Sequence, residues 1–236
     1  MWIIMTSAID EEFQFDTPVV LFGAAPVTAG VAACLDGLRG LPVIAADGGV
    51  HTALSFGLQP LAVIGDMDSA DLHTELPAEI RQIRVSEQDD TDFEKCLNLI
   101  KAPFIVGVGF LDGRFDHALS VLNVMARRPL TQIVLLIGAS DLVLRLAGDC
   151  DLALEPGTRV SVWPLWHQEF IRSAGLEWPL DGLSMTAGRT VGTSNRVCAS
   201  RVSIKAGAGD GYCLMTPPSC FAAFYEVACS LTMTGR

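Results

Sequence analysis

Short apolar runs alternate with polar or amphipathic stretches over the first 137 residues of the chain. The apolar runs predict buried strands at 18–23, 42–46, 61–64, 83–85, 104–108 and 133–137. The stretches between them predict helices at 28–38, 50–56, 71–82, 92–100 and 116–127. Strands that alternate with helices favour a parallel sheet covered by helices on both faces.

The helix expected from residue 92 has a defined start. Thr91 and Glu94 have the spacing of a capping box, in which the threonine hydroxyl accepts a backbone N–H of the first turn. The stripe that follows has the i, i+3, i+4, i+7 spacing of a core-facing helix: Phe93, Cys96, Leu97 and Ile100.

The pattern changes after about residue 138. Short, partly alternating runs separated by Gly and Pro predict antiparallel strands of a sandwich or barrel at 143–146, 152–154, 159–163, 201–205 and 212–215. We therefore expect an α/β domain over residues 1–142, with a mostly parallel, Rossmann-like sheet, and an antiparallel β-sandwich domain over 143–236. The apolar segment 217–236 is compatible with two interpretations, a last strand or an exposed tail.

Composition narrows the function classes. Half of the 236 residues are hydrophobic and the net charge is −11, which argues against nucleic acid or an anionic membrane as partner. Seven cysteines without a Cys-x-x-Cys pair indicate a reducing compartment, and the four histidines lack the spacing of a zinc site. No signal peptide is recognisable, and no apolar run reaches the roughly 18 residues of a membrane span. We expect a cytoplasmic protein.

Two carboxylates follow the apolar run 61–64 almost at once. The turn 65–69 reads Gly-Asp-Met-Asp-Ser, so Asp66 and Asp68 stand at the end of a predicted buried strand. Open α/β sheets bind ligands at that edge, and paired carboxylates suit Mg²⁺ bound to substrate phosphates. Alone, the turn is equally explained as an ordinary acidic loop, because Asp and Ser are common turn residues.

Three further polar clusters follow predicted strands or open predicted helices. They are Asp-Gly-Gly at 47–49, Gln-Asp-Asp-Thr-Asp at 88–92, and Asp-Gly-Arg-Phe-Asp-His at 112–117. Parallel strands end at one edge of a sheet, so the clusters are expected to converge there. Arg114 is suited to bidentate phosphate contact, but a salt bridge to Asp112 or Asp116 explains it equally well. The helix dipole alone also explains Asp92.

Six motifs in this order resemble those of the thiamine pyrophosphokinase family. They lie at 46–49, 65–69, 89–95 and 113–117 in the first half, and at 175–180 (Gly-Leu-Glu-Trp-Pro-Leu) and 192–195 (Gly-Thr-Ser-Asn) in the second. The resemblance implies a nucleotide-binding α/β domain followed by a β-sandwich. It also implies a homodimer whose active site lies at the subunit interface, where thiamine contacts one chain's acidic edge and the partner's sandwich.

The resemblance also implies an activity and a set of residues. Pyrophosphate would pass from the co-substrate ATP to the hydroxyethyl group of thiamine, giving thiamine diphosphate and AMP. By position, the Mg²⁺ ligands are Asp66, Asp68 and Asp92, which with Arg114 form the catalytic set. The ATP contacts are Asp47, Gly48, Gly49, Lys95, Arg114, Asp116 and His117. The thiamine contacts are Asp47, Gln88, Ser194 and Asn195, while Trp178 is read as a sandwich-core aromatic. Which Asp accepts the hydroxyl proton stays open.

The chain departs from the family pattern in three places. Asp112 precedes Gly113-Arg114 where a second glycine is usual, the first strand ends in Gly-Ala-Ala at 23–25, and Met67 stands where Phe is common. The first two departures affect the details of the contacts to the nucleotide and not the reaction. Two rival functions remain: a haloacid-dehalogenase-like phosphatase with Asp66 as nucleophile, and a non-catalytic thiamine or nucleotide binding module.

Overall fold

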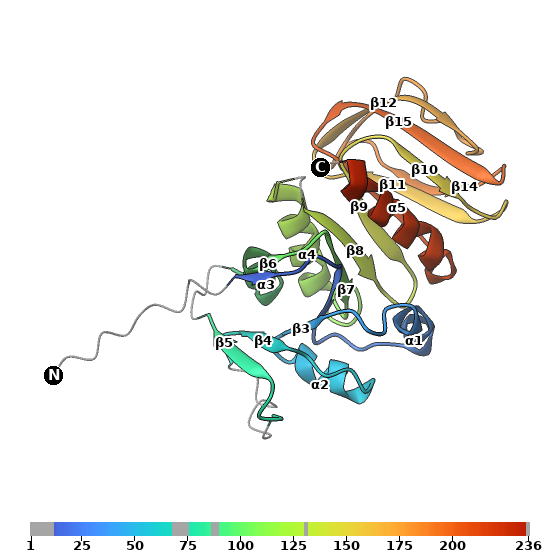
Figure 1. Cartoon of the computed structure of the whole chain (residues 1–236). Helices are drawn as coiled ribbons and strands as arrows, with labels where there is room; N and C mark the ends of the chain where they lie inside the picture. Colours follow the sequence, from blue (N-terminus) through green and yellow to red (C-terminus); the bar gives the residue numbers. More distant parts are fainter. Residues whose placement is uncertain (1–11, 68–75, 86–89, 130–131, 235–236) are drawn as a thin grey trace.

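The computed structural model describes residues 12–67, 76–85, 90–129 and 132–234. Its main element is a ten-stranded sheet in the order β14-β11-β16-β9-β8-β7-β2-β3-β4-β5. A four-stranded sheet, β10-β15-β12-β13, lies over the β14–β9 end of the large sheet (Figure 1). A short pair, β1 (Phe13–Gln14) and β6 (Ile100–Lys101), lies at the side of the α/β part.

Six strands form the parallel half of the large sheet. They are β2 (Val19–Phe22), β3 (Val43–Ala46), β4 (Ala62–Gly65), β5 (Arg81–Arg84), β7 (Phe104–Val108) and β8 (Ile133–Ile137). The first three strands and β7 are buried along their whole length. This burial explains their unbroken apolar runs, because helices cover both faces of a parallel sheet.

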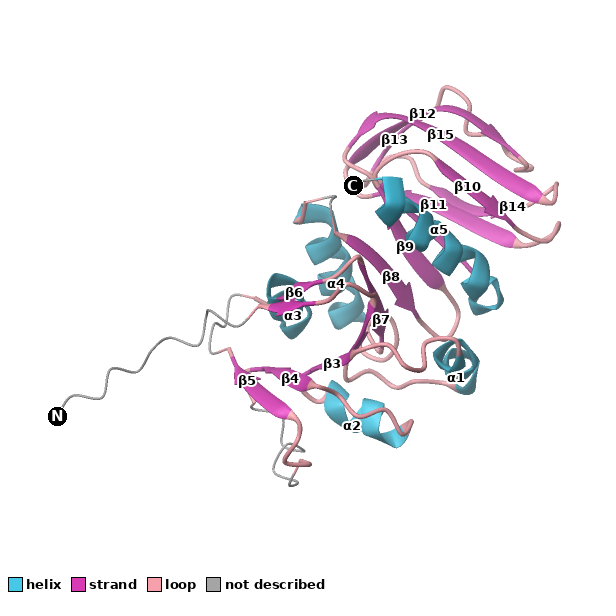
Figure 2. Ribbon diagram, in the orientation of Figure 1, coloured by secondary structure: helices cyan, strands magenta, loops and turns pink. Residues whose placement is uncertain are grey.

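The helices divide between the two faces (Figure 2). One face carries α1 (Ala29–Asp36), α2 (Gly49–Ser55) and α5 (Phe221–Thr234). The other carries α3 (Asp92–Leu99) and α4 (Phe115–Arg127). The predicted stripe of α3 is confirmed, since Phe93, Cys96 and Leu97 are buried. None of the helices in the described part of the chain is long and apolar enough to cross a membrane.

The expectation of a mostly parallel sheet is not confirmed, because the large sheet is mixed. Strand β9 (Leu142–Leu146) turns back antiparallel beside β8 and starts an antiparallel half with β16 (Tyr212–Thr216), β11 (Arg159–Pro164) and β14 (Gly192–Arg196). The second sheet contains β10 (Cys150–Ala153), β12 (His167–Ala174), β13 (Ser184–Thr186) and β15 (Arg201–Gly209), all antiparallel. The two antiparallel layers form the sandwich.

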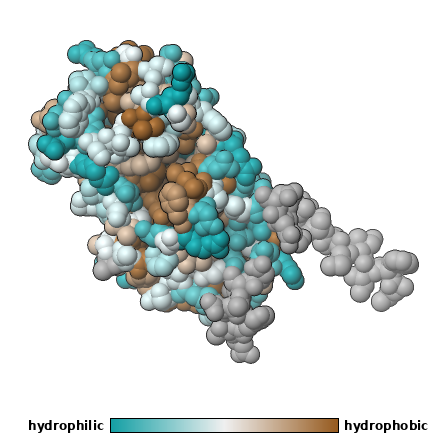
Figure 3. Space-filling view, turned by 180° about the vertical axis from the view of Figure 1, so that it is seen from behind, coloured by the Kyte–Doolittle hydropathy of each residue, from teal (hydrophilic) through white to brown (hydrophobic). Residues whose placement is uncertain are grey.

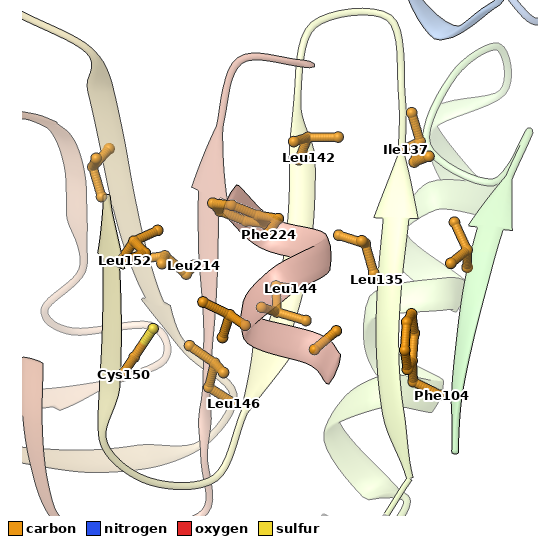
Figure 4. Close-up of a cluster of buried hydrophobic side chains, with 14 of the residues drawn as sticks. Phe104, Leu135, Ile137, Leu142, Leu144, Leu146, Cys150, Leu152, Leu214 and Phe224 are labelled. Carbon is orange, nitrogen blue, oxygen red and sulfur yellow. The ribbon is translucent and has the colours of Figure 1, made fainter. Parts of the chain in front are cut away.

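Residues 217–236 are neither a strand nor an exposed tail over their described part, which corrects both expectations. A 3₁₀ turn, η3 (Pro218–Cys220), leads into α5, whose Phe224 is 0% exposed. Phe224 lies over β9 and β16 among Leu142, Leu144 and Leu214 (Figure 4). Since α5 packs on β7, β8, β9 and β10, it covers the region where the parallel half meets the sandwich.

The expected helix at 71–82 is wrong where the structure describes it. Residues 76–80 form a loop with a turn, and 81–84 belong to β5. The remainder of that prediction, 71–75, lies outside the described residues.

Candidate active site

Two adjacent parallel strands deliver Asp47 and Asp66 to one edge of the sheet. Asp47 follows β3 and Asp66 follows β4, and the backbone N–H of Asp47 donates to the carbonyl of Ile64 at 2.9 Å. A side chain at Gly65 would place its Cβ 2.9 Å from the Cβ of Asp47. Glycine at 65 therefore lets the two acidic turns approach each other closely.

Asp92 joins these two acids from the start of α3. One carboxylate oxygen from each of Asp47, Asp66 and Asp92 lies within 4.8 Å of the other two. Asp47 is buried at 8% exposure, and the other two are half-buried. Three carboxylates this close repel one another, and a bound divalent cation would remove the repulsion.

Asp92 is held by its own helix. Thr91 accepts the N–H of Glu94 at 3.3 Å, as the capping box predicts, while the Glu94 carboxylate pairs with Arg127 of α4. The ammonium of Lys95, 4% exposed, donates to Asp92 Oδ1 at 3.0 Å. Burial raises the pKa of Asp92, the Lys95 bond opposes that rise, and the charges of Asp47 and Asp66 add to it.

The cap at Thr91 has a measurable effect. Thr91→Ala is expected to lower the free energy of unfolding by about 1 kcal/mol, because the N–H of Glu94 loses its acceptor. Thr91→Ser keeps a hydroxyl acceptor and is the matched control. Urea unfolding of both variants checks this; equal stability of the alanine and serine variants would contradict the capping role.

A cavity of about 720 Å³ opens beside the carboxylates. Its wall is formed by residues 23–26, 46–47, 91–93, 109–110 and 112–114, with His117, Ser120 and Val121. The loops after β2 and β7 are joined where the Ala25 N–H donates to Gly109 O at 3.1 Å. A Cβ at Gly23 would lie 2.4 Å from the same oxygen, so a side chain there would separate the loops. The cavity wall thus combines these two closely packed loops with the acidic residues Asp47 and Asp92.

Arg114 lies at the rim of this cavity and pairs with Asp116, not Asp112. Its guanidinium donates to both Asp116 carboxylate oxygens, at 3.2 and 2.6 Å, and both side chains are exposed. The arginine bond holds the pKa of Asp116 below its usual value. Asp112 instead accepts the backbone N–H of Ala139 at 2.9 Å.

The expected nucleotide residues occupy different positions. Asp47, Arg114 and His117 line the cavity together with Asp92. Gly48 is the N-cap of α2 and Gly49 its first residue; a Cβ at Gly49 would lie 2.2 Å from Phe22 O, so this glycine is needed for packing. Lys95 is buried against Asp92. Asp68 and Gln88, expected as metal ligand and thiamine contact, lie outside the described residues.

The second expected substrate segment lies on β14, at the opposite end of the large sheet. Asn195 is buried; its amide donates to Trp178 O at 2.7 Å and accepts Trp178 N–H at 3.2 Å. Trp178 is 54% exposed, so reading it as a core aromatic is wrong. The backbone N–H of Ser194 donates to Ser161 Oγ at 3.0 Å.

Sequence reasoning missed two features of the site. Asp47 was expected near the substrates, yet it lies within the acidic cluster. The loops at 23–26 and 109–110 were not expected to form the cavity wall together. Gly23 at the end of one predicted strand and Gly109 directly after another were the available signal.

Comparison with known proteins follows the same division of the chain. A family model described as thiamin pyrophosphokinase, catalytic domain, matches residues 41–135. A second, described as thiamin pyrophosphokinase, vitamin B1 binding domain, matches residues 149–209. Thiamin pyrophosphokinase 1 of Caenorhabditis elegans is 32% identical over 180 residues, which are 69% of this chain and 74% of that protein.

Other relatives agree. Thiamine pyrophosphokinase 1 of rice is 30% identical over 175 residues, 62% of each chain. The crystal structure of thiamine pyrophosphokinase from Bacillus subtilis shares the fold with a TM-score of 0.68 at 22% identity, over 86% of this chain and 99% of that one. The Candida albicans enzyme gives a TM-score of 0.67 at 16% identity, over 91% and 94%. The chain belongs to the thiamin pyrophosphokinase family.

Proposed function

We propose that this protein transfers pyrophosphate from ATP to the hydroxyethyl oxygen of thiamine, giving thiamine diphosphate and AMP. One observation carries the proposal: three carboxylates converge, and two of them, Asp47 and Asp92, line a cavity with Arg114 at its rim. In phosphoryl-group transfer, positioning and charge stabilisation supply most of the rate gain. A cavity with carboxylates that could hold cations and a guanidinium at its rim is suited to both tasks.

The acidic cluster fits Mg²⁺. Ligand oxygens about 2.1 Å from an octahedral ion lie about 3 to 4 Å from one another, within the 4.8 Å spread of the cluster. We propose Asp66, Asp92 and Asp47 as ligands; Asp68, the further ligand that the resemblance implies, lies outside the described residues. When bound, the ion neutralises charge that develops on the triphosphate. Lys95 keeps Asp92 oriented toward the cluster.

The remaining contacts concern ATP. We propose that the triphosphate lies between the acidic cluster and the loops at 23–26 and 109–114. Arg114, at the rim, would exchange Asp116 for a phosphate, since a guanidinium binds both groups in the same bidentate way. His117 lines the same wall. Attack of the thiamine hydroxyl on the β-phosphorus then releases AMP.

The thiamine segment cannot reach this edge within one chain. Strands β14 and β4 are separated by seven others in the sheet, so Ser194 and Asn195 lie on the order of 40 Å from the acidic cluster at about 4.8 Å per strand. We propose that a partner subunit supplies the segment in a homodimer. Trp178 is then the exposed aromatic beside the segment, with its backbone held by Asn195.

Exposed apolar side chains support a dimer surface on the α4 side of the sheet. Phe115 and Leu119 of α4 are 74% and 49% exposed. Trp163, 36% exposed, pairs with Cys213 across neighbouring strands. Cys213 belongs to the hydrophobic cluster on the α3 and α4 side of the sheet, so the Trp163 side chain shares that face. Figure 3 shows apolar residues gathered across the middle of the surface seen from behind. Exposed apolar patches of this kind mark interaction sites.

A charge at this surface tests the dimer. Leu119→Glu is expected to convert the protein to monomers and to reduce turnover, because a buried carboxylate at an interface is unpaired. Leu61→Glu, at a leucine of matched exposure (48%) just before β4, is the control and should change neither. Sedimentation velocity measures both. A Leu119→Glu protein that remains dimeric would remove α4 from the interface.

The roles of the two parts of the chain and the cellular location also belong to the proposal. We assign ATP and Mg²⁺ to residues 1–142 and thiamine binding to 143–236, supported by family matches on either side of that boundary. Dimerisation was expected from 143–236 alone, but the surface proposed above also includes α4 of the first part. We also propose a cytoplasmic location, supported by cysteines that are all unpaired thiols.

The direct assay is incubation with ATP, Mg²⁺ and thiamine, followed by separation of nucleotides and thiamine esters. We expect AMP and thiamine diphosphate only when all three are present. Oxythiamine, which keeps the hydroxyethyl group, should still accept pyrophosphate if it binds, whereas a thiamine analogue without the hydroxyl should not. Phosphate release independent of thiamine, with a trapped aspartyl-phosphate at Asp66, would favour the phosphatase alternative.

A further inference from the structure

Asp112 is the one charged side chain of the cavity wall that neither the acidic cluster nor the Arg114–Asp116 pair accounts for in the described residues. It is half-buried, and its Oδ2 accepts the backbone N–H of Ala139 at 2.9 Å. Ala139 belongs to the turn between β8 and β9, so the bond joins the cavity loop to a separate part of the sheet.

The β8–β9 turn is a firm attachment point. It is closed by the Gly138 N–H donating to Asp141 O at 2.9 Å. A Cβ at Gly138 would lie 3.0 Å from the Cβ of Leu111, so this turn packs directly against the residue before Asp112. On its other side, Asp141 pairs with Arg159 of β11 at 2.7 Å. A strand of the sandwich therefore contacts the same turn to which Asp112 is hydrogen-bonded.

The residues after Asp112 need such an attachment. Gly113 is in the left-handed region, at φ 78°, and Arg114 is the N-cap of α4 without a side-chain cap bond. A short turn of this kind has few internal bonds to fix it. The position of Arg114 at the cavity rim therefore depends on what holds Asp112.

We infer that Asp112 is a positioning residue: its carboxylate anchors the 112–114 turn to the β8–β9 turn and so places Arg114 and the cavity wall for the nucleotide. It does this as a hydrogen-bond acceptor and not through its charge, since a negative charge on this wall opposes a triphosphate. The statement about ATP rests on the proposed function; the anchoring bond does not.

Acceptor and charge can be separated by substitution. Asp112→Asn keeps an acceptor oxygen and removes the charge. Asp112→Glu keeps the charge but displaces the oxygen by one methylene, and Asp112→Ala removes both. Asp149→Ala is the matched control, because Asp149 accepts the N–H of Ala206 at 3.0 Å in the same way on the sandwich, away from the cavity.

The readouts are the KM for ATP, the KM for thiamine, and binding of a fluorescent ATP analogue without thiamine. We expect Asp112→Ala and Asp112→Glu to raise the KM for ATP and the Kd of the ATP analogue about five- to tenfold, because the loss of one hydrogen bond costs about 1 kcal/mol. The KM for thiamine should stay within twofold of the wild-type value. Asp112→Asn should match or exceed wild-type affinity. If the alanine variant does not fold, the other two variants still test the inference, because Asp112→Asn should keep nucleotide affinity and Asp112→Glu should lower it.

Other outcomes overturn the inference. Equal weakening by Asn and Ala would mean that the charge acts directly, as a metal or substrate contact. No change in any variant would mean that the turn needs no anchor. Analogue binding is independent of catalysis, so a wild-type protein that binds the analogue but forms no AMP would reject the proposed reaction while the anchoring is still tested.

Discussion

Asp66→Asn is expected to lower kcat/KM for pyrophosphoryl transfer by on the order of 10²- to 10³-fold. Asp66 is one of three carboxylates with oxygens within 4.8 Å of one another, and asparagine removes one negative charge while keeping the shape. A cation held by fewer charges binds less tightly and neutralises less of the charge that develops on the triphosphate. Steady-state kinetics over a range of Mg²⁺ concentrations measure the loss.

The Mg²⁺ dependence makes the test specific. The Mg²⁺ concentration for half-maximal rate should rise in Asp66→Asn, and the far-ultraviolet circular dichroism should be unchanged. Asp36→Asn removes an exposed carboxylate that pairs only with Arg39 in the described structure and is the control; it should match the wild type. An Asp66→Asn protein with wild-type turnover and Mg²⁺ dependence would remove Asp66 from the site.

Phe224→Ala is expected to lower the free energy of unfolding by about 3–5 kcal/mol, the largest stability effect of any change described for this chain. Phe224 is 0% exposed and fills the space between α5 and strands β9 and β16, as Figure 4 shows. Truncation leaves a cavity in the core shared by the parallel half and the sandwich. Chemical denaturation monitored by tryptophan fluorescence measures the change.

The same helix provides the control for that measurement. Glu226 lies on the exposed side of α5, so Glu226→Ala should change stability by no more than about 0.5 kcal/mol. If Phe224→Ala also lowered the free energy of unfolding by only about 0.5 kcal/mol, α5 would not be part of the cooperative core. In that case the sheet would have to be stable without its C-terminal cover.

The local elements of the first half were predictable because their signals are local. Buried parallel strands give unbroken apolar runs, and the Thr91 cap with its stripe fixed both the start and the inner face of α3. The convergence of the polar segments that contain Asp47, Asp66 and Asp92 also followed, because parallel strands end at one edge, although the place of Asp47 among the carboxylates did not. That prediction needed only the direction of the strands and the start of α3.

The mixed sheet was not predictable from periodicity. A change from long runs to short alternating ones marks a change of environment, but it does not say which strands pair. The turn at Gly138 brings β9 back beside β8, so the pattern break lies inside one continuous sheet. Strand pairing across this turn is a tertiary property that no local spacing records.

The sequence of α5 contains a helical pattern of apolar residues, but other features of the segment obscure it. Phe224, Val227, Ala228 and Leu231 have the i, i+3, i+4, i+7 spacing of a helix face, and the first three are buried. Apolar and small residues on the remaining positions hide that stripe, and Pro217 and Pro218 before it are typical of a loop. Trp178 was misjudged for a different reason: its exposure depends on the backbone bonds to Asn195, which are long-range.

The most direct test of the account follows the γ-phosphate of ATP. With γ-labelled ATP, Mg²⁺ and thiamine, pyrophosphoryl transfer predicts that the label appears in the terminal phosphate of thiamine diphosphate, in equal amount to the AMP formed. Label released as inorganic phosphate without thiamine dependence, or label in a thiamine monophosphate with ADP as the other product, would contradict it.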